Sequence, residues 1–389
     1  MMTPRERMLA TLRHRMPDRV PILPSMRPEM LEALKKHYQL ADAGEVFKLW
    51  DADLLRYAGI KTDWSAFDQR ANGKPPGMYA SMGPMVMRDE RTFEDHWGIV
   101  QRVGSDGKYL EWVSGPFAHT DDLDRFDWPN ESRLIDDSGL AAKVAEFKRQ
   151  GYWVSGSSGT HPFKQAWHMR GFENFLCDYV ANPEFVEAIY ERILAYVIPM
   201  CRRSAAAGVD MLEFWGDISM QDRMIVPPDA WRALDKPVWK RIITETRKIK
   251  PDVRFFFHSD GNPSEIVDDI IEVGFDILNP IQPECVNPAE VKARWGDRLT
   301  LHGGGSNQRT LPFGTLEDVK REVDFLMQYC AYDGGYIFSA ANLISFDPPV
   351  ENVALFHELA RDYDLSKVKR PPKGSRLPAP PCLHVKVSL

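Results

Sequence analysis

The sequence predicts a single (β/α)₈ TIM barrel, an α/β fold of eight parallel strands each followed by a helix. Apolar or β-branched runs recur along the chain, end in small or polar residues, and are followed by helical patterns. The runs are apolar on both faces, which is typical of a parallel sheet covered by helices. From the third run onward their spacing is roughly 25–55 residues, the size of a βα unit. Eight such units close a barrel whose active site lies at the carboxyl ends of the strands.

The strands and the clearest helix starts follow in chain order. The predicted strands are 19–26, 53–59, 152–159, 209–216, 253–261, 275–282, 299–306 and 336–342. Thr3 and Glu6 form a capping box around a proline, which predicts an N-terminal helix. Thr315 and Asp318 predict a second helix start of this kind. The last barrel helix is expected to begin near Glu351.

The predicted barrel domain spans residues 1–366. Two segments depart from the barrel pattern, one inside this domain and one after it. Residues 60–150, between the second and third strands, are too long for a simple crossover. Their alternating, aromatic-rich pieces predict a β-rich insertion over the barrel mouth. Residues 367–389 are rich in proline and basic residues, which predicts an exposed tail.

Composition excludes several classes of function. The chain has 389 residues and a net charge of −7, without a block dense in lysine and arginine, which argues against nucleic acid as a partner. No apolar run has the length of a signal peptide or a membrane span. The five cysteines form no CxxC pair and are interpreted as reduced thiols, so we expect a cytoplasmic protein.

The fifth strand ends in the run FFFHSDGN, which carries the strongest functional signal. His258 and Asp260 are two residues apart and therefore lie on the same side of an extended chain. An imidazole and a carboxylate at this spacing can share a proton or a metal ion. Asp217 ends the fourth strand, where it is either an active-site residue or a solvated loop cap.

Glu213 and Trp215 share the parity of Asp217 and are predicted to point into the barrel. A glutamate inside an apolar barrel is costly unless it is paired. Two interpretations stay open. Glu213 either forms a buried ion pair with Arg254 or acts as a catalytic acid or ligand.

Other strand ends supply candidate substrate-binding residues. Gln282 lies between two prolines that stiffen its loop, and Glu284 shares its parity. Gly304 belongs to a glycine run after His302 that forms either a binding wall or a tight turn. The predicted substrate-binding set is Arg27, Trp215, Gln282, Gly304 and Asn342.

Several motifs resemble the uroporphyrinogen decarboxylase superfamily. They are TPRERMLATLRHRMPDRVPI, GVDMLEFWGDIS, FFFHSDGN, DILNPIQP, GDRLTLHGGGSNQRTLPFGT, and GGYIF followed by DPPVENV. The resemblance runs in order from about residue 3 to residue 363. It implies a (β/α)₈ barrel and one of two chemistries. These are decarboxylation of uroporphyrinogen without a cofactor, and zinc-dependent methyl transfer involving corrinoid proteins.

The decarboxylase branch implies motifs that this chain lacks. Its arginine-rich MRQAGR motif is replaced by Met26, Arg27 and Pro28. The second strand reads LLRYAG without the expected aspartate, and the eighth reads SAANLI without the expected histidine. A substrate with four propionates needs several cations, so the sequence argues against the heme-pathway reaction.

The methyltransferase branch implies a zinc site built from a His-x-Cys pair on strand five and a cysteine on strand eight. His258 occupies the histidine position, Asp260 occupies the cysteine position, and strand eight offers no cysteine. The resemblance therefore implies a site of harder ligands, with His258, Asp260 and Glu284, or alternatively Glu213 or Asp217.

The resemblance thus implies a methyltransferase that moves a methyl group from a small methyl ether or methylamine to a corrinoid protein. Zinc, or a protonated His258 held by Asp260, would stabilise the departing atom. The chain lacks a DxHxxG corrinoid-binding pattern, so the corrinoid is expected on a partner protein. A homodimer is also compatible with the superfamily. A metal-free decarboxylase and a non-catalytic ligand-binding barrel are the alternatives.

Overall fold

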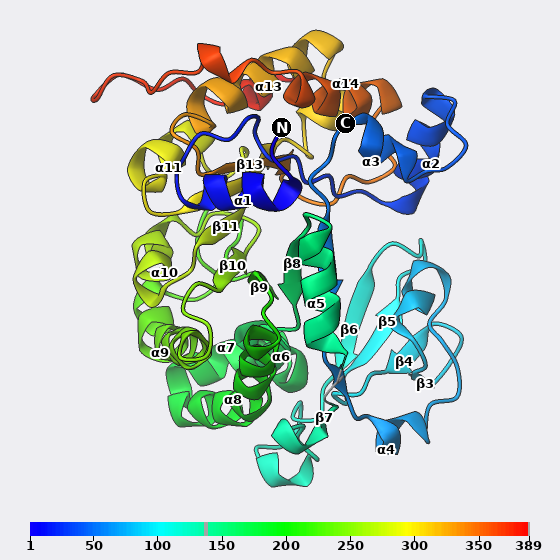
Figure 1. The fold of residues 1–389 in the computed structure, drawn as a ribbon. Helices are drawn as coiled ribbons and strands as arrows, with labels where there is room; N and C mark the ends of the chain where they lie inside the picture. Colours follow the sequence, from blue (N-terminus) through cyan, green and yellow to red (C-terminus); the bar gives the residue numbers. More distant parts are fainter. Residues whose placement is uncertain (136–138, 388–389) are drawn as a thin grey trace.

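A curled sheet of parallel strands forms the centre of the computed structural model, which describes residues 1–135 and 139–387 (Figure 1). Its seven strands follow the order β1-β8-β9-β10-β11-β12-β13. They are β1 (Leu55–Ala58), β8 (Trp153–Gly156), β9 (Met211–Trp215), β10 (Arg254–His258), β11 (Ile277–Ile281), β12 (Thr300–Gly305) and β13 (Tyr336–Ala340). Each lies inside one of the predicted strands, so the positions of seven barrel strands are confirmed.

The first predicted strand, 19–26, is not a regular strand in the structure. It makes only isolated parallel bridges, from Ile22 to Phe338 and from Met26 to Ile344. The backbone N–H of Asp53, just before β1, donates to the carbonyl of Ile22 at 2.8 Å. Because Pro21 and Pro24 have no N–H to donate, a continuous ladder cannot form here. The segment still lies between β13 and the start of β1.

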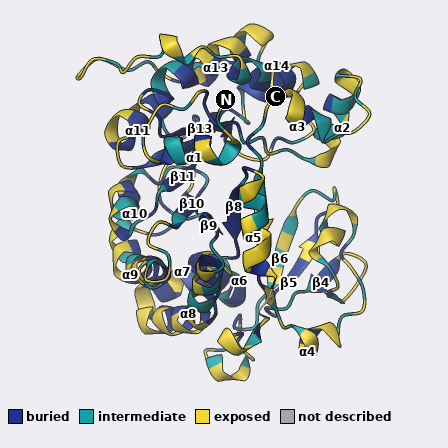
Figure 2. Ribbon diagram, in the orientation of Figure 1, coloured by how far each residue is buried: buried dark blue, intermediate teal, exposed yellow. Residues whose placement is uncertain are grey.

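Helices follow the strands and cover the outside of the sheet, with their exposed faces turned to solvent (Figure 2). The barrel helices are α2 (Pro28–His37), α5 (Leu140–Arg149), α8 (Pro183–Ala206), α9 (Pro228–Arg247), α10 (Val267–Val273), α11 (Pro288–Trp295), α13 (Leu316–Cys330) and α14 (Val350–Arg361). Shorter helices are α3 (Glu45–Leu49), α6 (Pro162–Arg170), α7 (Phe172–Ala181) and α12 (Thr310–Phe313). Both predicted capping boxes are present, at Thr3 and Thr315. Among the described helices, none has the length and apolarity to cross a membrane.

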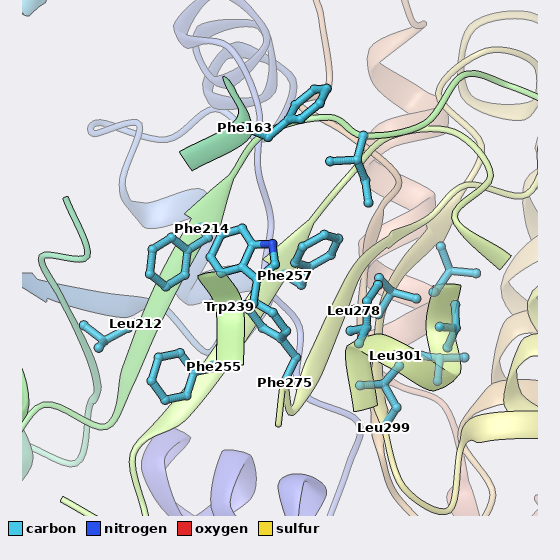
Figure 3. Close-up of a cluster of buried hydrophobic side chains, with 14 of the residues drawn as sticks. Phe163, Leu212, Phe214, Trp239, Phe255, Phe257, Phe275, Leu278, Leu299 and Leu301 are labelled. Atoms are coloured by element: carbon cyan, nitrogen blue, oxygen red, sulfur yellow. The ribbon is translucent and has the colours of Figure 1, made fainter. Parts of the chain in front are cut away.

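The strands are apolar on both faces, as a covered parallel sheet requires. Outward-facing residues of β9 and β10, including Phe214 and Phe257, pack around Trp239 of α9 (Figure 3). Inside the ring, Met8 and Leu12 of helix α1 (Pro4–Leu12) pack against inward-facing side chains of the strands. These are Trp153, Met211, Phe256, Ile277 and Ile337. Helix α1 therefore closes the amino-terminal end of the barrel.

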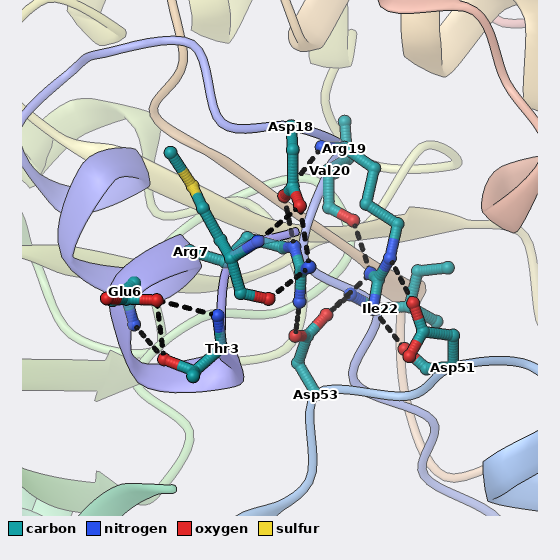
Figure 4. Close-up of polar contacts among 10 residues, drawn as sticks. Thr3, Glu6, Arg7, Asp18, Arg19, Val20, Ile22, Asp51 and Asp53 are labelled. Atoms are coloured by element: carbon teal, nitrogen blue, oxygen red, sulfur yellow. Dashed lines mark hydrogen bonds and ion pairs between the residues drawn. The ribbon is translucent and has the colours of Figure 1, made fainter. Parts of the chain in front are cut away.

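A buried ion-pair network holds α1 to the sheet (Figure 4). Asp53 is fully buried and accepts hydrogen bonds from Arg7 of α1 and from Arg19, the latter at 2.6 Å. Asp18 also pairs with Arg7 at 2.7 Å. The network therefore joins α1, the irregular first segment and the start of β1.

The segment between β1 and α5 contains a second, antiparallel sheet. It is formed by β3 (Val86–Met87), β4 (Thr92–Glu94), β5 (Val100–Val103) and β6 (Leu110–Ser114). The same segment also contains a separate two-stranded antiparallel sheet, β2 (Lys61–Thr62) and β7 (Leu134–Ile135), and helix α4 (Ser65–Asp68). Its small core contains Phe67, Met85, Phe93 and Val103. Helix α5, inside the predicted range 60–150, packs on β1 and β8, so it belongs to the barrel and not to the insertion.

The carboxyl-terminal segment is not the fully exposed tail that the composition predicts. Residues Pro381–His384 form a short 3₁₀ turn that packs against α13. The side chain of Cys382 is completely buried, and Val385 is buried beside it. These apolar side chains give the segment a surface to bury, which a count of prolines and basic residues overlooks. Residues 388–389 lie outside the described part of the chain.

Candidate active site

A cavity of about 410 Å³ opens among the carboxyl ends of the strands, inside the barrel. Glu213 and Trp215 of β9 and His258 of β10 line it, which agrees with the inward direction predicted from their parity. Part of the cavity wall is apolar and includes Met211 and Phe256. Among the described residues that line it, none is a lysine or an arginine.

The carboxylates of Asp217 and Asp260 lie beside His258, which lines this cavity. Ligand atoms of Asp217, His258 and Asp260 all lie within 4.8 Å of one another. The Nε2 atom of His258 is 3.5 Å from Oδ1 of Asp217. That carboxylate oxygen also accepts the backbone N–H of Asp260 at 2.9 Å, which ties the loop after β9 to the loop after β10. We refer to these three residues as the triad.

The carboxylate of Asp260 is held in place from the far side of the barrel. Asn342, just after β13, donates its side-chain amide to Oδ2 of Asp260 at 2.6 Å. Burial and the nearby charge of Asp217 raise the pKa of Asp260, while His258 and Asn342 oppose that rise. Asn342, predicted to bind substrate, thus holds a carboxylate of the triad in this structure.

Asn279 orients the imidazole of His258, and the sequence analysis assigned it no role. Its Oδ1 lies 2.7 Å from Nδ1 of His258. An amide oxygen only accepts, so Nδ1 carries a proton, and the other ring nitrogen, Nε2, faces Oδ1 of Asp217 at 3.5 Å. The available signal was a lone amide in the otherwise apolar strand ILNPI.

The triad has the composition of a metal site. One imidazole nitrogen and two carboxylates are acceptable zinc ligands, and a three-ligand set leaves a position for substrate. The contact from Asn279 to the second ring nitrogen of His258 is the kind of support that metal-binding histidines have. The residues present therefore fit a divalent cation such as zinc.

The predicted third metal ligand, Glu284, is not part of this group. Its Oε1 accepts a short hydrogen bond from the hydroxyl of Ser306, which follows β12. Glu284 lines a neighbouring cavity of about 330 Å³ instead. The position next to His258 and Asp260 is taken by Asp217, because the loop after β9 packs directly on the loop after β10.

Gln282 and Asn342 also line this second, polar cavity. The Oε1 atom of Gln282 accepts the backbone N–H of Gly261 at 3.0 Å. Gly261 has a φ of +88°, and a Cβ there would meet the carbonyl oxygen of Met220 at 2.1 Å, so only glycine fits. Gln282 therefore supports the loop that carries Asp260.

Glu213 does not pair with Arg254, which contradicts the ion-pair interpretation. Arg254 instead pairs with Asp276 at 2.7 Å. The Oε2 atom of Glu213 accepts the indole N–H of Trp215 at 3.0 Å. Its Oε1 atom is buried with no hydrogen-bond partner among the described residues. Burial raises the pKa of Glu213, and the side chains of Trp215 and Ser155 oppose that rise.

Two predicted substrate-binding residues lie elsewhere. Gly304 faces outward, and a Cβ there would meet Leu326 of α13 at 2.7 Å. It lets the helix approach the strand and forms no binding wall. The guanidinium of Arg27 donates to the Sδ of Met78 at 2.8 Å and to the carbonyl of Lys108 at 3.4 Å. It therefore holds the insertion, and it does not line the cavity.

Further polar groups in the cavity are His302 and Ser339. The Nε2 atom of His302 is buried without a hydrogen-bond partner among the described residues. Burial lowers the pKa of His302 to about 3, so this ring is neutral near pH 7. A third cavity of about 300 Å³ shares Glu213 and Trp215 with the first. Hydroxyl-bearing residues such as Tyr57 and Ser157 also line it.

Comparisons with known proteins agree with this architecture. The family model described as uroporphyrinogen decarboxylase (URO-D) matches residues 141–363. A uroporphyrinogen decarboxylase of Legionella pneumophila (strain Corby) is 25% identical over 247 residues, which cover 62% of this chain and 63% of the relative. The match thus spans less than two thirds of that curated relative.

A solved methyltransferase from Methanosarcina mazei has a similar fold. The TM-score is 0.59 at 16% sequence identity, and the match covers 93% of this chain and 99% of the other. At this identity the likeness shows the fold alone. It confirms the predicted barrel architecture.

Proposed function

This chain belongs to the uroporphyrinogen decarboxylase family, as its motifs predicted, and we propose that it is a methyltransferase of that superfamily. It moves a methyl group from a small methyl ether or methylated amine to the cobalt of a corrinoid carried by a partner protein. The structural likeness to a methyltransferase supports the fold on which this chemistry would run.

The single observation that carries the proposal is the absence of lysine and arginine among the described residues lining the barrel cavity. A substrate with several carboxylates would bury its charges there without partners, which costs several kcal/mol for each group in order-of-magnitude terms. A small, largely apolar methyl donor meets no such cost. Heme-pathway decarboxylation is therefore the weaker candidate for this cavity.

The triad supplies the chemistry that a departing methyl donor needs. His258 is oriented by Asn279 so that Nε2 faces the carboxylates of Asp217 and Asp260. Protonated at Nε2, His258 would be stabilised by these carboxylates and would donate that proton to the departing atom. Zinc bound by Asp217, His258 and Asp260 would supply Lewis acidity to the same atom.

Methyl transfer from a panel of ethers and methylated amines to reduced corrinoid protein tests the proposal. Loss of the cobalt(I) absorbance should require both the donor and the wild-type enzyme. His258→Ala should lower the rate at least about 100-fold, within the range expected for loss of a general acid. His119→Ala removes an exposed histidine of the insertion and should leave the rate unchanged.

Equal rates in the wild type and His258→Ala would contradict the proposed site. Release of carbon dioxide from a carboxylated substrate, without corrinoid, would instead support the decarboxylase alternative.

A further inference from the structure

The wall between the first and third cavities is formed by two residues with complementary chemistry. Glu213 and Trp215 line both cavities. The indole N–H of Trp215 donates to Glu213 Oε2 at 3.0 Å, which fixes the ring beside the carboxyl group. The ring centroid of Trp215 also lies 5.0 Å from that of Phe256 and 4.7 Å from that of His258. An aromatic ring and a carboxyl group therefore lie side by side in the wall that separates the two cavities.

Both members of this pair have unused binding capacity. Trp215 is 51% exposed, so part of its indole ring is accessible to a ligand. Glu213 Oε1 is buried and has no hydrogen-bond partner among the described residues. No cationic side chain of the described residues occupies this oxygen, so a positively charged ligand beside it would be attracted by charge and would need no N–H to donate.

The surrounding charges favour a cation. None of the described residues lining the first, second or third cavity is a lysine or an arginine. Asp260 and Glu284 line the second cavity, and Asp217 lies beside Asp260 and His258. The ring of His302, in the first cavity, is neutral near pH 7. A ligand with its own carboxylate would find no cationic side chain to pair with on these walls.

We infer that Glu213 and Trp215 recognise a quaternary methylammonium group, and that the methyl donor is a small quaternary ammonium compound without a carboxylate. Tryptophan is the aromatic side chain that attracts such cations most strongly, and aromatic sites are a common means of recognising them. The hydroxyl groups of Tyr57 and Ser157, 2.7 Å apart in the third cavity, suit a short polar tail such as an alcohol.

This inference rests on the proposed methyl transfer for its chemistry. One N–CH₃ bond breaks, and its electron pair stays on the nitrogen, which leaves as a neutral tertiary amine. Cobalt(I) of the corrinoid supplies both electrons of the new Co–C bond and becomes methylcobalt(III). No proton is consumed in this step, because the amine leaves as a neutral molecule.

Calorimetric titration with choline and with 3,3-dimethylbutan-1-ol tests the inference without any corrinoid. The alcohol has the shape of choline, with a carbon in place of the charged nitrogen. We expect choline to bind at least about tenfold more tightly, which corresponds to a cation–aromatic and charge contribution of ordinary size. Glu213→Gln and Trp215→Leu should each remove most of that preference.

Two controls keep the result interpretable. Binding of the neutral alcohol by each variant shows that its cavity is intact. Glu265→Gln changes an exposed carboxylate outside these three cavities and should bind choline like the wild type. Equal affinity for choline and the alcohol in the wild type, or no binding of choline, would overturn the inference.

The outcomes also separate this inference from the proposed function. Methyl transfer from ethers by a protein without a preference for choline would refute the cation site alone. Selective choline binding without methyl transfer to cobalt would refute the methyltransferase proposal and leave the recognition of the cation standing.

Discussion

At the scale of single residues, the direction of one imidazole decides what the site can do. The Oδ1 atom of Asn279 accepts a hydrogen bond from Nδ1 of His258, which leaves Nε2 facing Asp217 and Asp260. Without that contact the ring could rotate, and Nε2 would no longer be held toward the carboxylates.

Replacing Asn279 therefore tests the orientation directly. Asn279→Ala should weaken zinc binding about 10- to 100-fold, the usual cost of losing a partner of a metal-binding histidine. Asn279→Asp keeps an acceptor at the same position and should lose much less. Competition with a chromophoric chelator measures both affinities. Unchanged affinity in Asn279→Ala would mean that the contact does not orient the ring.

Part of the site could be predicted at this scale because side chains alternate between the two faces of a strand, so a residue's position in the strand indicates whether it points into the barrel. The alternation along β9 and β10 placed Glu213, Trp215 and His258 inside the barrel, where they lie. Parity cannot tell which loops pack together. Glu284 was therefore assigned to the metal group although Ser306, from another strand end, binds it.

At the scale of elements, the junction of α7, α8 and α9 contains a buried acid. Asp235 of α9 accepts hydrogen bonds from Tyr179 of α7 and, at 2.9 Å, from Tyr190 of α8. Burial raises the pKa of Asp235 to about 7, and the two tyrosines only partly offset that effect. The carboxyl group is thus protonated in the folded protein at pH values where it is ionised in the unfolded chain.

This difference predicts how stability depends on pH. Between about pH 4 and pH 7 the folded state binds one more proton at Asp235 than the unfolded state, so the free energy of unfolding falls as pH rises through this window. Across this window, Asp235 changes the free energy of unfolding by as much as about 4 kcal/mol. Asp235→Asn should remove that slope. Urea denaturation of the wild type and the variant at pH 5 and pH 7 gives the change in the free energy of unfolding between these two pH values. The same change in both proteins would contradict the prediction.

Sequence patterns predicted the elements well where one physical signal dominates. Doubly apolar runs located seven strands, and capping boxes located the starts of α1 and α13. The first segment shows the limit, because its two prolines interrupt the ladder without changing its hydrophobic pattern. The carboxyl-terminal turn shows another limit, since burial of Cys382 depends on the surface that α13 provides.

At the scale of the whole molecule, a buried ion-pair network joins separate segments of the barrel at its amino-terminal end. Asp53 binds Arg7 and Arg19 together, and these residues come from three separate segments (Figure 4). Because all three side chains are largely buried, losing the central charge leaves two guanidinium groups poorly compensated.

Asp53→Asn should therefore destabilise the protein by about 3–5 kcal/mol. Asp51→Asn is the matched control, since Asp51 also pairs with Arg19 but its side chain is 55% exposed. Its loss should cost less than about 1 kcal/mol. Chemical denaturation measures both values. Similar losses for the two variants would show that the buried network does not fasten the barrel.

The same barrel brings Asp217, His258 and Asp260 together at its opposite, carboxyl end, where we propose that they act as one set of metal ligands. The most direct measurement is the zinc content of purified wild-type, His258→Ala and His119→Ala proteins by plasma mass spectrometry. We expect near-stoichiometric zinc in the wild type and in His119→Ala, and its loss from His258→Ala. Equal zinc in all three proteins, or zinc in none, would contradict the claim.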